Sequence, residues 1–279
     1  MQGRKLKIAL VQSGRQRYAP EKNLSETVKR LQKLDAADIV CLPEVWLGGV
    51  VYTEKEMSRL LEDLASIAKE KRFVLLTGGL LEKRNGKVFD VCHVIDKEQG
   101  VPGEQIKLFP SAAVGERGFL DGGPELAVFH CDGVSLGILV CVDMMYPELA
   151  RALALSGAEV IFNPANIPDD RNPLWHGLIR TRAAENTVFV AYVNNTGTTY
   201  LDGRPVTGRS MVASPSGDIL AAAGEEAKII TLSLDFDLVE KQRRRWPYLQ
   251  DVKDSDRDLM CAFPLKHIGI SKRTEDPSS

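Results

Sequence analysis

The stretch LGILVCVDMMYPELARALALSG, residues 136–157, places a cysteine between an apolar run and a helical pattern. Its first five residues are continuously apolar, which is typical of a strand covered on both faces of a sheet. Pro147 is suited to the first turn of a helix, and Gly157 is a natural left-handed terminator. The segment therefore predicts a strand, a tight turn carrying Cys141, and a helix from about Pro147 to Ser156.

A cysteine on such a turn is exposed at the edge of the sheet, where the amide N–H groups of the turn point toward a reaction partner. Free cysteine is, however, more often a small buried hydrophobe than a nucleophile. The position of Cys141 alone therefore leaves both interpretations open.

Similar apolar, β-branched runs recur along the chain between amphipathic, helix-like stretches. Turn signals at residues 84–86 and 215–218 indicate hairpins in the middle and near the end. This order of elements predicts an α/β fold with either one mixed sheet or two stacked sheets with helices outside. The runs expected as strands are Lys7–Val11, Ile39–Leu42, Phe73–Thr77, Val88–Ile95, Ser135–Val142, Val160–Asn163, Val188–Val193, Ser210–Ala213 and Lys228–Leu234.

Composition narrows the class of protein. The 279 residues are 44% hydrophobic and 27% charged, which is typical of one globular domain. A formal net charge of −2 argues against nucleic acid as the main partner, and no apolar run approaches the length of a membrane span. The five cysteines form no CxxC pair or zinc-type cluster, so we expect free thiols, no metal, and a cytosolic location.

Two further residues stand out by their surroundings. Glu44 ends the apolar run 39–43 beside Trp46, where desolvation favours a proton-carrying carboxylate, although a capping or ion-paired role is commoner. Lys107 is the one cation in the apolar segment 105–110; it can face an oxyanion, or extend to solvent.

The four histidines constrain the chemistry of any catalytic cysteine. None of them lies in a setting like that of papain-like or caspase-like proteases. If no histidine serves, a glutamate must take the thiol proton, and Glu44 is the leading candidate.

The order Glu44, Lys107, Cys141 resembles that of the nitrilase superfamily of carbon–nitrogen hydrolases. The likeness runs from Lys7 to about Tyr248. The segments that carry it are LPE at 42–44, CVDMMYPELAR at 141–151, GAEVIFNPA at 157–165, RAAEN at 182–186, and GRSMV at 208–212 leading into PSG at 215–217.

The resemblance implies a four-layer α-β-β-α sandwich with mixed sheets over residues 1–248, followed by a C-terminal extension or arm at 249–279. It implies a Glu–Lys–Cys triad, assistance from Glu116, and no cofactor. It also implies subunits that pair as a homodimer or a larger homo-oligomer. The segment 243–248 mixes cations with aromatics, and we interpret it as docking on a partner subunit.

Two positions depart from the pattern common in the family. One register of the lysine segment places Gln105 where the lysine belongs, but Gln105 carries no charge, so the chemistry favours Lys107. The second departure is Asp90, which stands where asparagine is frequent.

The expected reaction is cleavage of a small amide or carbamoyl compound through a cysteine thioester, with the backbone N–H of Val142 helping to bind the oxyanion. Val142 and the residue after it favour an amide over a nitrile. The alternatives are a nitrilase, or a non-catalytic binding protein with the same fold. Candidate substrate-binding residues are Tyr146, Asn166 and Trp175.

Overall fold

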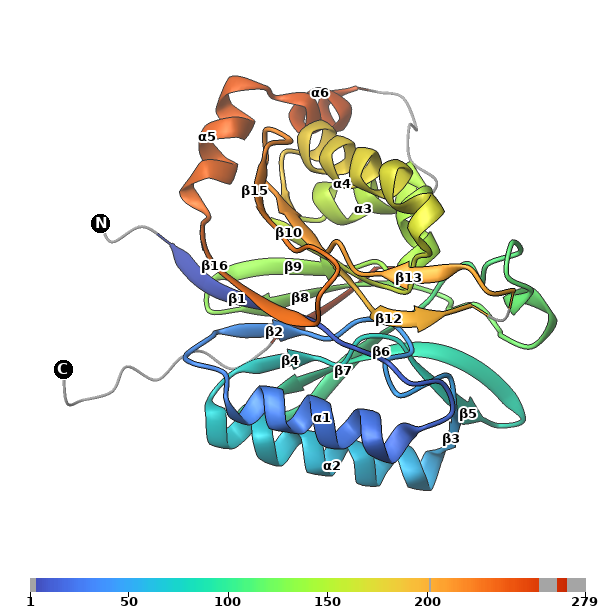
Figure 1. Ribbon diagram of the computed structural model, residues 1–279. Coiled ribbons are helices and arrows are strands. Elements are labelled where there is room, and N and C mark those ends of the chain that lie inside the picture. Colours follow the sequence, from blue (N-terminus) through green and yellow to red (C-terminus); the bar gives the residue numbers. More distant parts are fainter. Residues whose placement is uncertain (1–3, 201, 256–264, 270–279) are drawn as a thin grey trace, which may run out of the picture.

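Two β-sheets stack face to face with helices on both outer faces (Figure 1). The computed structural model describes residues 4–200, 202–255 and 265–269. Both sheets contain parallel and antiparallel pairs. The expected four-layer α-β-β-α sandwich is therefore confirmed, and the choice between one sheet and two is settled in favour of two.

The first sheet has eight strands and is built from the N-terminal half of the chain and one late strand. Its order is β16-β1-β2-β4-β6-β5-β3, and β7 also pairs with β6. The strands are β1 (Lys5–Gln12), β2 (Ile39–Cys41), β3 (Val51–Thr53), β4 (Val74–Leu76), β5 (Leu80–Arg84), β6 (Lys87–Asp96), β7 (Gly100–Ile106) and β16 (Lys228–Asp235).

The second sheet has seven strands in the order β15-β14-β11-β10-β9-β8-β17. Its last strand, β17, adds a segment of the C-terminal extension parallel to β8. The strands are β8 (Leu126–Cys131), β9 (Val134–Ile138), β10 (Val160–Ala165), β11 (Phe189–Asn194), β14 (Met211–Ala213), β15 (Ile219–Ala222) and β17 (Leu265–Gly269).

Helices cover the outer faces. Helices α1 (Pro20–Gln32) and α2 (Glu54–Lys71) pack on the first sheet, and α3 (Pro147–Leu155) and α4 (Asn172–Asn186) pack on the second (Figure 1). The start of α2 is fixed by a capping box, in which Thr53 and Glu56 satisfy each other's backbone N–H groups. Smaller elements are β12 (Thr196–Thr199), β13 (Pro205–Thr207), α5 (Asp237–Arg245), α6 (Tyr248–Asp254) and three 3₁₀ turns, η1 (Glu116–Gly118), η2 (Cys141–Met145) and η3 (Asp169–Arg171).

Most of the apolar core lies between the sheets and under α3 and α4, and a second cluster fills the space between the first sheet and α1 and α2. The continuous apolar runs of the sequence are explained by this burial, because strands such as β10 and β11 are covered on both faces. No helix in the described part of the chain is long and apolar enough to cross a membrane.

The predicted hairpins form at 84–87 and at 213–219. The first is a two-residue turn in which Asn85 and Gly86 both have positive φ, the geometry that such short hairpins require. The strands that lie outside the predicted runs are β3, β5, β7, β8, β12, β13, β15 and β17. A proline and two glycines in β7 obscure its pattern, since these residues are depleted in strands.

A buried polar network ties three neighbouring strands of the first sheet together. Nε2 of His93 on β6 lies 3.1 Å from Glu82 Oε2 on β5, and its Nδ1 lies 3.3 Å from Glu104 Oε2 on β7. Arg84 also donates to Glu82 at 2.7 Å. Partial burial acts to raise the pKa of Glu82, but hydrogen bonds from His93 and Arg84 outweigh it and lower that pKa to about 2.

Because the folded pKa of Glu82 lies below its unfolded value, its ionised form stabilises the fold, and this stabilisation is lost as the pH falls between the two values. We expect Glu82→Gln to lower the free energy of unfolding by about 1 to 3 kcal/mol at neutral pH, because buried partners lose a charged acceptor. The gap between variant and wild type should narrow as the pH falls from about 5 to about 3. Urea unfolding across this range measures it, with Glu62→Gln on the exposed face of α2 as control. A gap that stays constant with pH would contradict the assignment.

Candidate active site

Cys141 lies on a sharp turn between β9 and η2. Its φ is +49°, a left-handed conformation that costs energy for a residue with a side chain. The turn brings the thiol to the end of the second sheet, with 7% of the residue exposed. The predicted strand, turn and helix are all present, and α3 begins at Pro147 as expected.

Asn163 on β10 holds this turn in place. Its Nδ2 donates to the carbonyl oxygens of Leu139, at 2.6 Å, and Cys141, at 3.1 Å. Trp175 Nε1 in turn donates to Asn163 Oδ1 at 3.3 Å. The strained backbone of the cysteine is thus fixed by a fully buried amide that α4 orients.

Lys107 follows β7 and is fully buried. Its ammonium donates to Glu44 Oε1 at 2.7 Å and to Glu116 Oε2 at 2.8 Å, and it lies 3.6 Å from Asp90 Oδ2. Burial alone would lower the pKa of Lys107, but the negative charge of Glu44, with a smaller contribution from Glu116, raises it well above its ordinary value. Lys107 is therefore a permanent cation.

Glu44 follows β2 and lies where the two sheets meet. Its backbone N–H donates to the carbonyl of Ala165 on β10 at 3.3 Å, and its carbonyl accepts a 2.6 Å hydrogen bond from Asn195 Nδ2 after β11. The carboxylate is thus set by contacts to both sheets. Glu116 on η1 is more exposed, and its Oε2 also accepts a 2.6 Å hydrogen bond from the N–H of Ser111.

The side chain of Gln105 points away from this cluster. Its Nε2 donates to the carbonyls of Ile106 and Glu125, and its Oε1 accepts from Ala127 N–H at 2.8 Å. Gln105 therefore joins β7 to the second sheet, and the cation beside Glu44 is Lys107.

The thiol of Cys141 is neutral at rest. Burial, followed by the negative charge of Glu44, raises its pKa well above the ordinary value, and the opposing effect of Lys107 is smaller. A base must therefore remove the proton as the sulfur attacks.

Asp143 joins the lysine segment to the cysteine turn. Its two carboxylate oxygens accept hydrogen bonds from the backbone N–H groups of Leu108 and Phe109, each at 2.9 Å. Burial raises the pKa of Asp143 to about 7 despite these two bonds. Sequence reasoning did not assign it a positioning role, although an acidic residue two positions after the cysteine was visible.

A cavity of about 170 Å³ opens onto Cys141. Trp175 lines it, as predicted. Tyr146 does not; its ring packs on Phe109 with centroids 4.3 Å apart. Asn166 is also outside the lining, and its side chain accepts from Asn195. Lining residues that the sequence did not indicate are Ser111, Ala113, Val114, Ile167, Pro168, Arg171, Tyr200 and Arg204.

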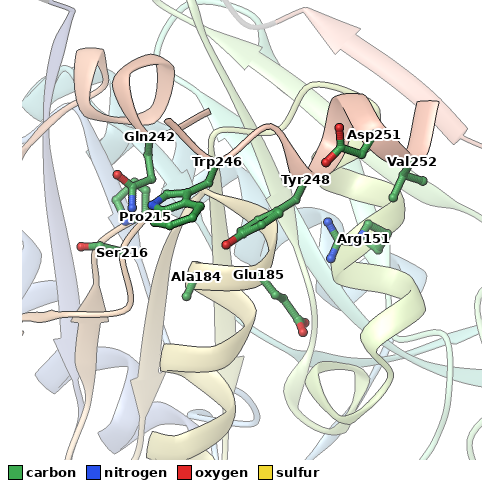
Figure 2. A pocket seen from close by; sticks show the side chains of 10 residues that line it. All are labelled: Arg151, Ala184, Glu185, Pro215, Ser216, Gln242, Trp246, Tyr248, Asp251 and Val252. Carbon is green, nitrogen blue, oxygen red and sulfur yellow. The ribbon is translucent and has the colours of Figure 1, made fainter. Parts of the chain in front are cut away.

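A larger cavity of about 650 Å³ lies elsewhere, between α3, α4 and the α5–α6 segment. Figure 2 shows the rings of Trp246 and Tyr248 beside Ala184 and Glu185 of α4. None of the buried charged groups around Lys107 lines it. The chemistry therefore points to the smaller cavity.

Comparison with known proteins agrees with this geometry. The family model for carbon–nitrogen hydrolases matches residues 7–244. The hydrolase in the agr operon of Staphylococcus aureus is 31% identical over 77% of this chain and 85% of that protein. The 2-oxoglutaramate amidase of Bacillus subtilis is 28% identical over 84% and 92%, and an (R)-stereoselective amidase of Pseudomonas sp is 30% identical over 88% and 91%.

Solved structures show the same fold. The carbon–nitrogen hydrolase of Helicobacter pylori superposes with a TM-score of 0.80 at 22% identity, over 91% of this chain and 96% of that one. An amidase from Nesterenkonia sp. gives a TM-score of 0.77 at 23% identity, over 88% and 98%. This chain belongs to the carbon–nitrogen hydrolase family of the nitrilase superfamily, as its motifs predicted.

Proposed function

We propose that this protein hydrolyses a small amide through a thioester on Cys141. One observation carries the proposal: a fully buried ammonium, that of Lys107, lies between the carboxylates of Glu44 and Glu116 beside a cysteine that opens onto a cavity. A buried cluster of this composition supplies a nucleophile, a base and an electrophile in one place.

In the first step the sulfur of Cys141 attacks the amide carbon while Glu44 accepts the thiol proton. The carbonyl π bond breaks, and its electrons move to the oxygen. Because the thiol is neutral at rest, proton removal and attack belong to the same step.

Two hydrogen-bond donors stabilise the negative charge that develops on the oxygen. Lys107 uses two of its three ammonium hydrogens on Glu44 and Glu116, which leaves the third for the oxyanion. Val142 lies in the first turn of η2, where backbone N–H groups have no acceptor within the helix.

Collapse of the tetrahedral intermediate breaks the C–N bond, and Glu44 returns the proton to the leaving ammonia or amine. Water then attacks the thioester carbon while Glu44 or Glu116 takes its proton. Collapse of this second tetrahedral intermediate breaks the C–S bond, and the same carboxyl group returns the proton to the sulfur. The products are a carboxylic acid and the restored thiol.

The residues after the cysteine and the relatives named as amidases both support an amide substrate. One relative, from Pyrococcus abyssi, is named a nitrilase and is 29% identical over 91% of this chain. Nitriles therefore belong in any substrate panel.

We expect purified protein to release ammonia from small amides and Cys141→Ala to be at least about 10³-fold slower. Glu44→Gln should lose on the order of 10²-fold or more in kcat, because the thiol proton has no acceptor. Intact-mass spectrometry of trapped enzyme should show an acyl adduct that Cys141→Ala lacks. If neither wild type nor Cys141→Ala releases ammonia from amides, carbamoyl compounds or nitriles, the catalytic proposal is contradicted.

We further propose that the substrate carries a negative charge at the end remote from its amide. Arg171 and Arg204 line the same cavity as Cys141, and apolar Val114, Met145 and Ile167 also line it. Arg204 forms ion pairs with Asp202 at 2.9 Å and Asp170 at 3.7 Å. Within the described residues, no carboxylate lies within ion-pair distance of Arg171, so Arg171 supplies the charge that is available to a ligand. The relative from Bacillus subtilis is named for 2-oxoglutaramate, an amide with a carboxylate, and this supports the same class.

The test compares succinamate with butyramide, which have equal chain length but differ in charge. We expect kcat/KM to favour succinamate by about tenfold or more, and Arg171→Gln combined with Arg204→Gln to abolish the preference through KM. The double variant should still cleave butyramide. Equal rates on the two amides in wild type would exclude the arginines from substrate selection while leaving the amidase proposal intact.

For assembly, we propose a homodimer or larger homo-oligomer that forms over the α3–α4 face. Of the extension predicted at 249–279, residues 256–264 and 270–279 lie outside the described residues. Trp246 and Tyr248 are 43% and 42% exposed, and their stacked rings border the larger cavity (Figure 2). Exposed aromatic pairs beside a hollow are typical of interfaces.

We also propose a cytoplasmic location, because the four cysteines in the described residues are free thiols.

Combined replacement of Trp246 and Tyr248 by serine should shift the sedimentation coefficient from that of an oligomer to that of a monomer. The substitutions remove the exposed aromatic surface that, in our proposal, the partner subunit buries. Val51→Ser, at an equally exposed position on the opposite sheet, should leave the sedimentation unchanged. A wild type that sediments as a monomer at micromolar concentration would contradict the proposed interface.

A further inference from the structure

Asp90 has a buried carboxyl group at the active site, but none of the proposed catalytic steps uses it. It lies on β6 and is 1% exposed. Neither of its oxygens has a hydrogen-bond partner, and its Oδ2 is 3.6 Å from Lys107 Nζ, beyond hydrogen-bond distance. Buried polar atoms are rarely left without partners, so this group needs an explanation.

Gly79 lies against both Asp90 and Glu44. At Gly79, a Cβ atom would fall 2.3 Å from Asp90 Oδ1 and 2.8 Å from Glu44 Cγ. The absence of a side chain at this position gives both acids their space. Two carboxylates in such proximity cannot both ionise without a large cost.

The groups around Asp90 make its ionisation costly. Glu44 follows β2, Lys107 follows β7, Glu116 is on η1, Cys141 is on η2, and on its own strand the uncharged Cys92 is its neighbour. With three ionised acids and one ammonium, the site would carry two excess negative charges before the thiol reacts. One proton on Asp90 reduces this excess to one.

We propose that Asp90 is a neutral carboxylic acid in the resting enzyme and donates its proton in a hydrogen bond to the carboxylate of Glu44. It acts as a positioning residue, because it orients the base without touching the substrate. This inference rests on the proposed amidase function and on the role of Glu44 within it.

The electrostatics of the site agree with the geometry. Burial, followed by the charge of Glu44, raises the pKa of Asp90 well above its ordinary value, and Lys107 does not reverse this. A neutral carboxylic acid can donate a hydrogen bond, whereas a carboxylate can only accept one.

The experiment compares Asp90→Asn with Asp90→Leu. Asparagine keeps the donor, so kcat/KM should stay within about threefold of wild type. Leucine keeps the size but removes the donor, so kcat should fall on the order of 10²-fold with little change in KM. If Asp90 works as an anion, Asp90→Asn will fail as badly as Asp90→Leu, and the proposal is overturned. It is equally overturned if Asp90→Leu is fully active.

A second measurement does not depend on turnover. The rate of Cys141 alkylation by iodoacetamide at pH 7 reports the charge near the thiol, because it follows the small fraction present as thiolate. With a neutral Asp90, wild type and Asp90→Asn should react at rates within about twofold of each other. A rate raised about tenfold or more in Asp90→Asn would show that wild-type Asp90 is charged. This readout remains valid even if no amide is cleaved, so it separates failure of this inference from failure of the proposed function.

A matched control is the same substitution at Asp143. There both oxygens accept backbone N–H groups, and an amide can accept on only one side. Asp143→Asn should therefore lower the midpoint of thermal unfolding, whereas Asp90→Asn should not. If neither variant folds, infrared spectroscopy of wild type decides. Asp143 loses its proton as the pH rises through about 7, so the carbonyl band of a protonated carboxyl is expected to remain above that pH. Loss of the whole band over this titration contradicts the proposal.

Discussion

The structure of the site depends on the buried ammonium of Lys107. Three carboxyl groups from separate parts of the chain converge on it, and without a cation the ionised Glu44 and Glu116 would repel each other in a medium that screens charge poorly. Burying these ions is costly, and only short, well-directed hydrogen bonds offset the cost. The ammonium therefore fixes the positions of Glu44 and Glu116, and through them the approach to the thiol.

Local patterns in the sequence predicted the parts of the fold that local physics determines. The turn at Cys141, the helix after it and the hairpin at Asn85 follow from residue type and spacing alone. The contact between Glu44 and Lys107 spans 63 positions and could be reached only through the resemblance to a family. Lining residues such as Arg171 and Arg204 carry no local signal, because a charged residue in a loop looks the same whether or not a cavity lies beneath it.

The predicted site was also incomplete in its electrostatics. Whether a thiol is activated or neutral depends on burial, and burial at Cys141 comes from two sheets and the start of α4. Lysine proximity favours the thiolate, whereas desolvation and Glu44 oppose it more strongly. The same balance explains why Asp143 and Asp90, both buried, differ: the former has two backbone donors, and the latter has none.

Strand β17 has a consequence for synthesis of the chain. It pairs with β8 in parallel at the edge of the second sheet, although the two strands are separated by more than half of the molecule's elements. During synthesis, one edge of β8 therefore stays unpaired until residue 269 has left the ribosome, long after the core strands can assemble. An uncovered strand edge can pair with other nascent chains, so a segment made late in synthesis covers an edge that is prone to aggregation.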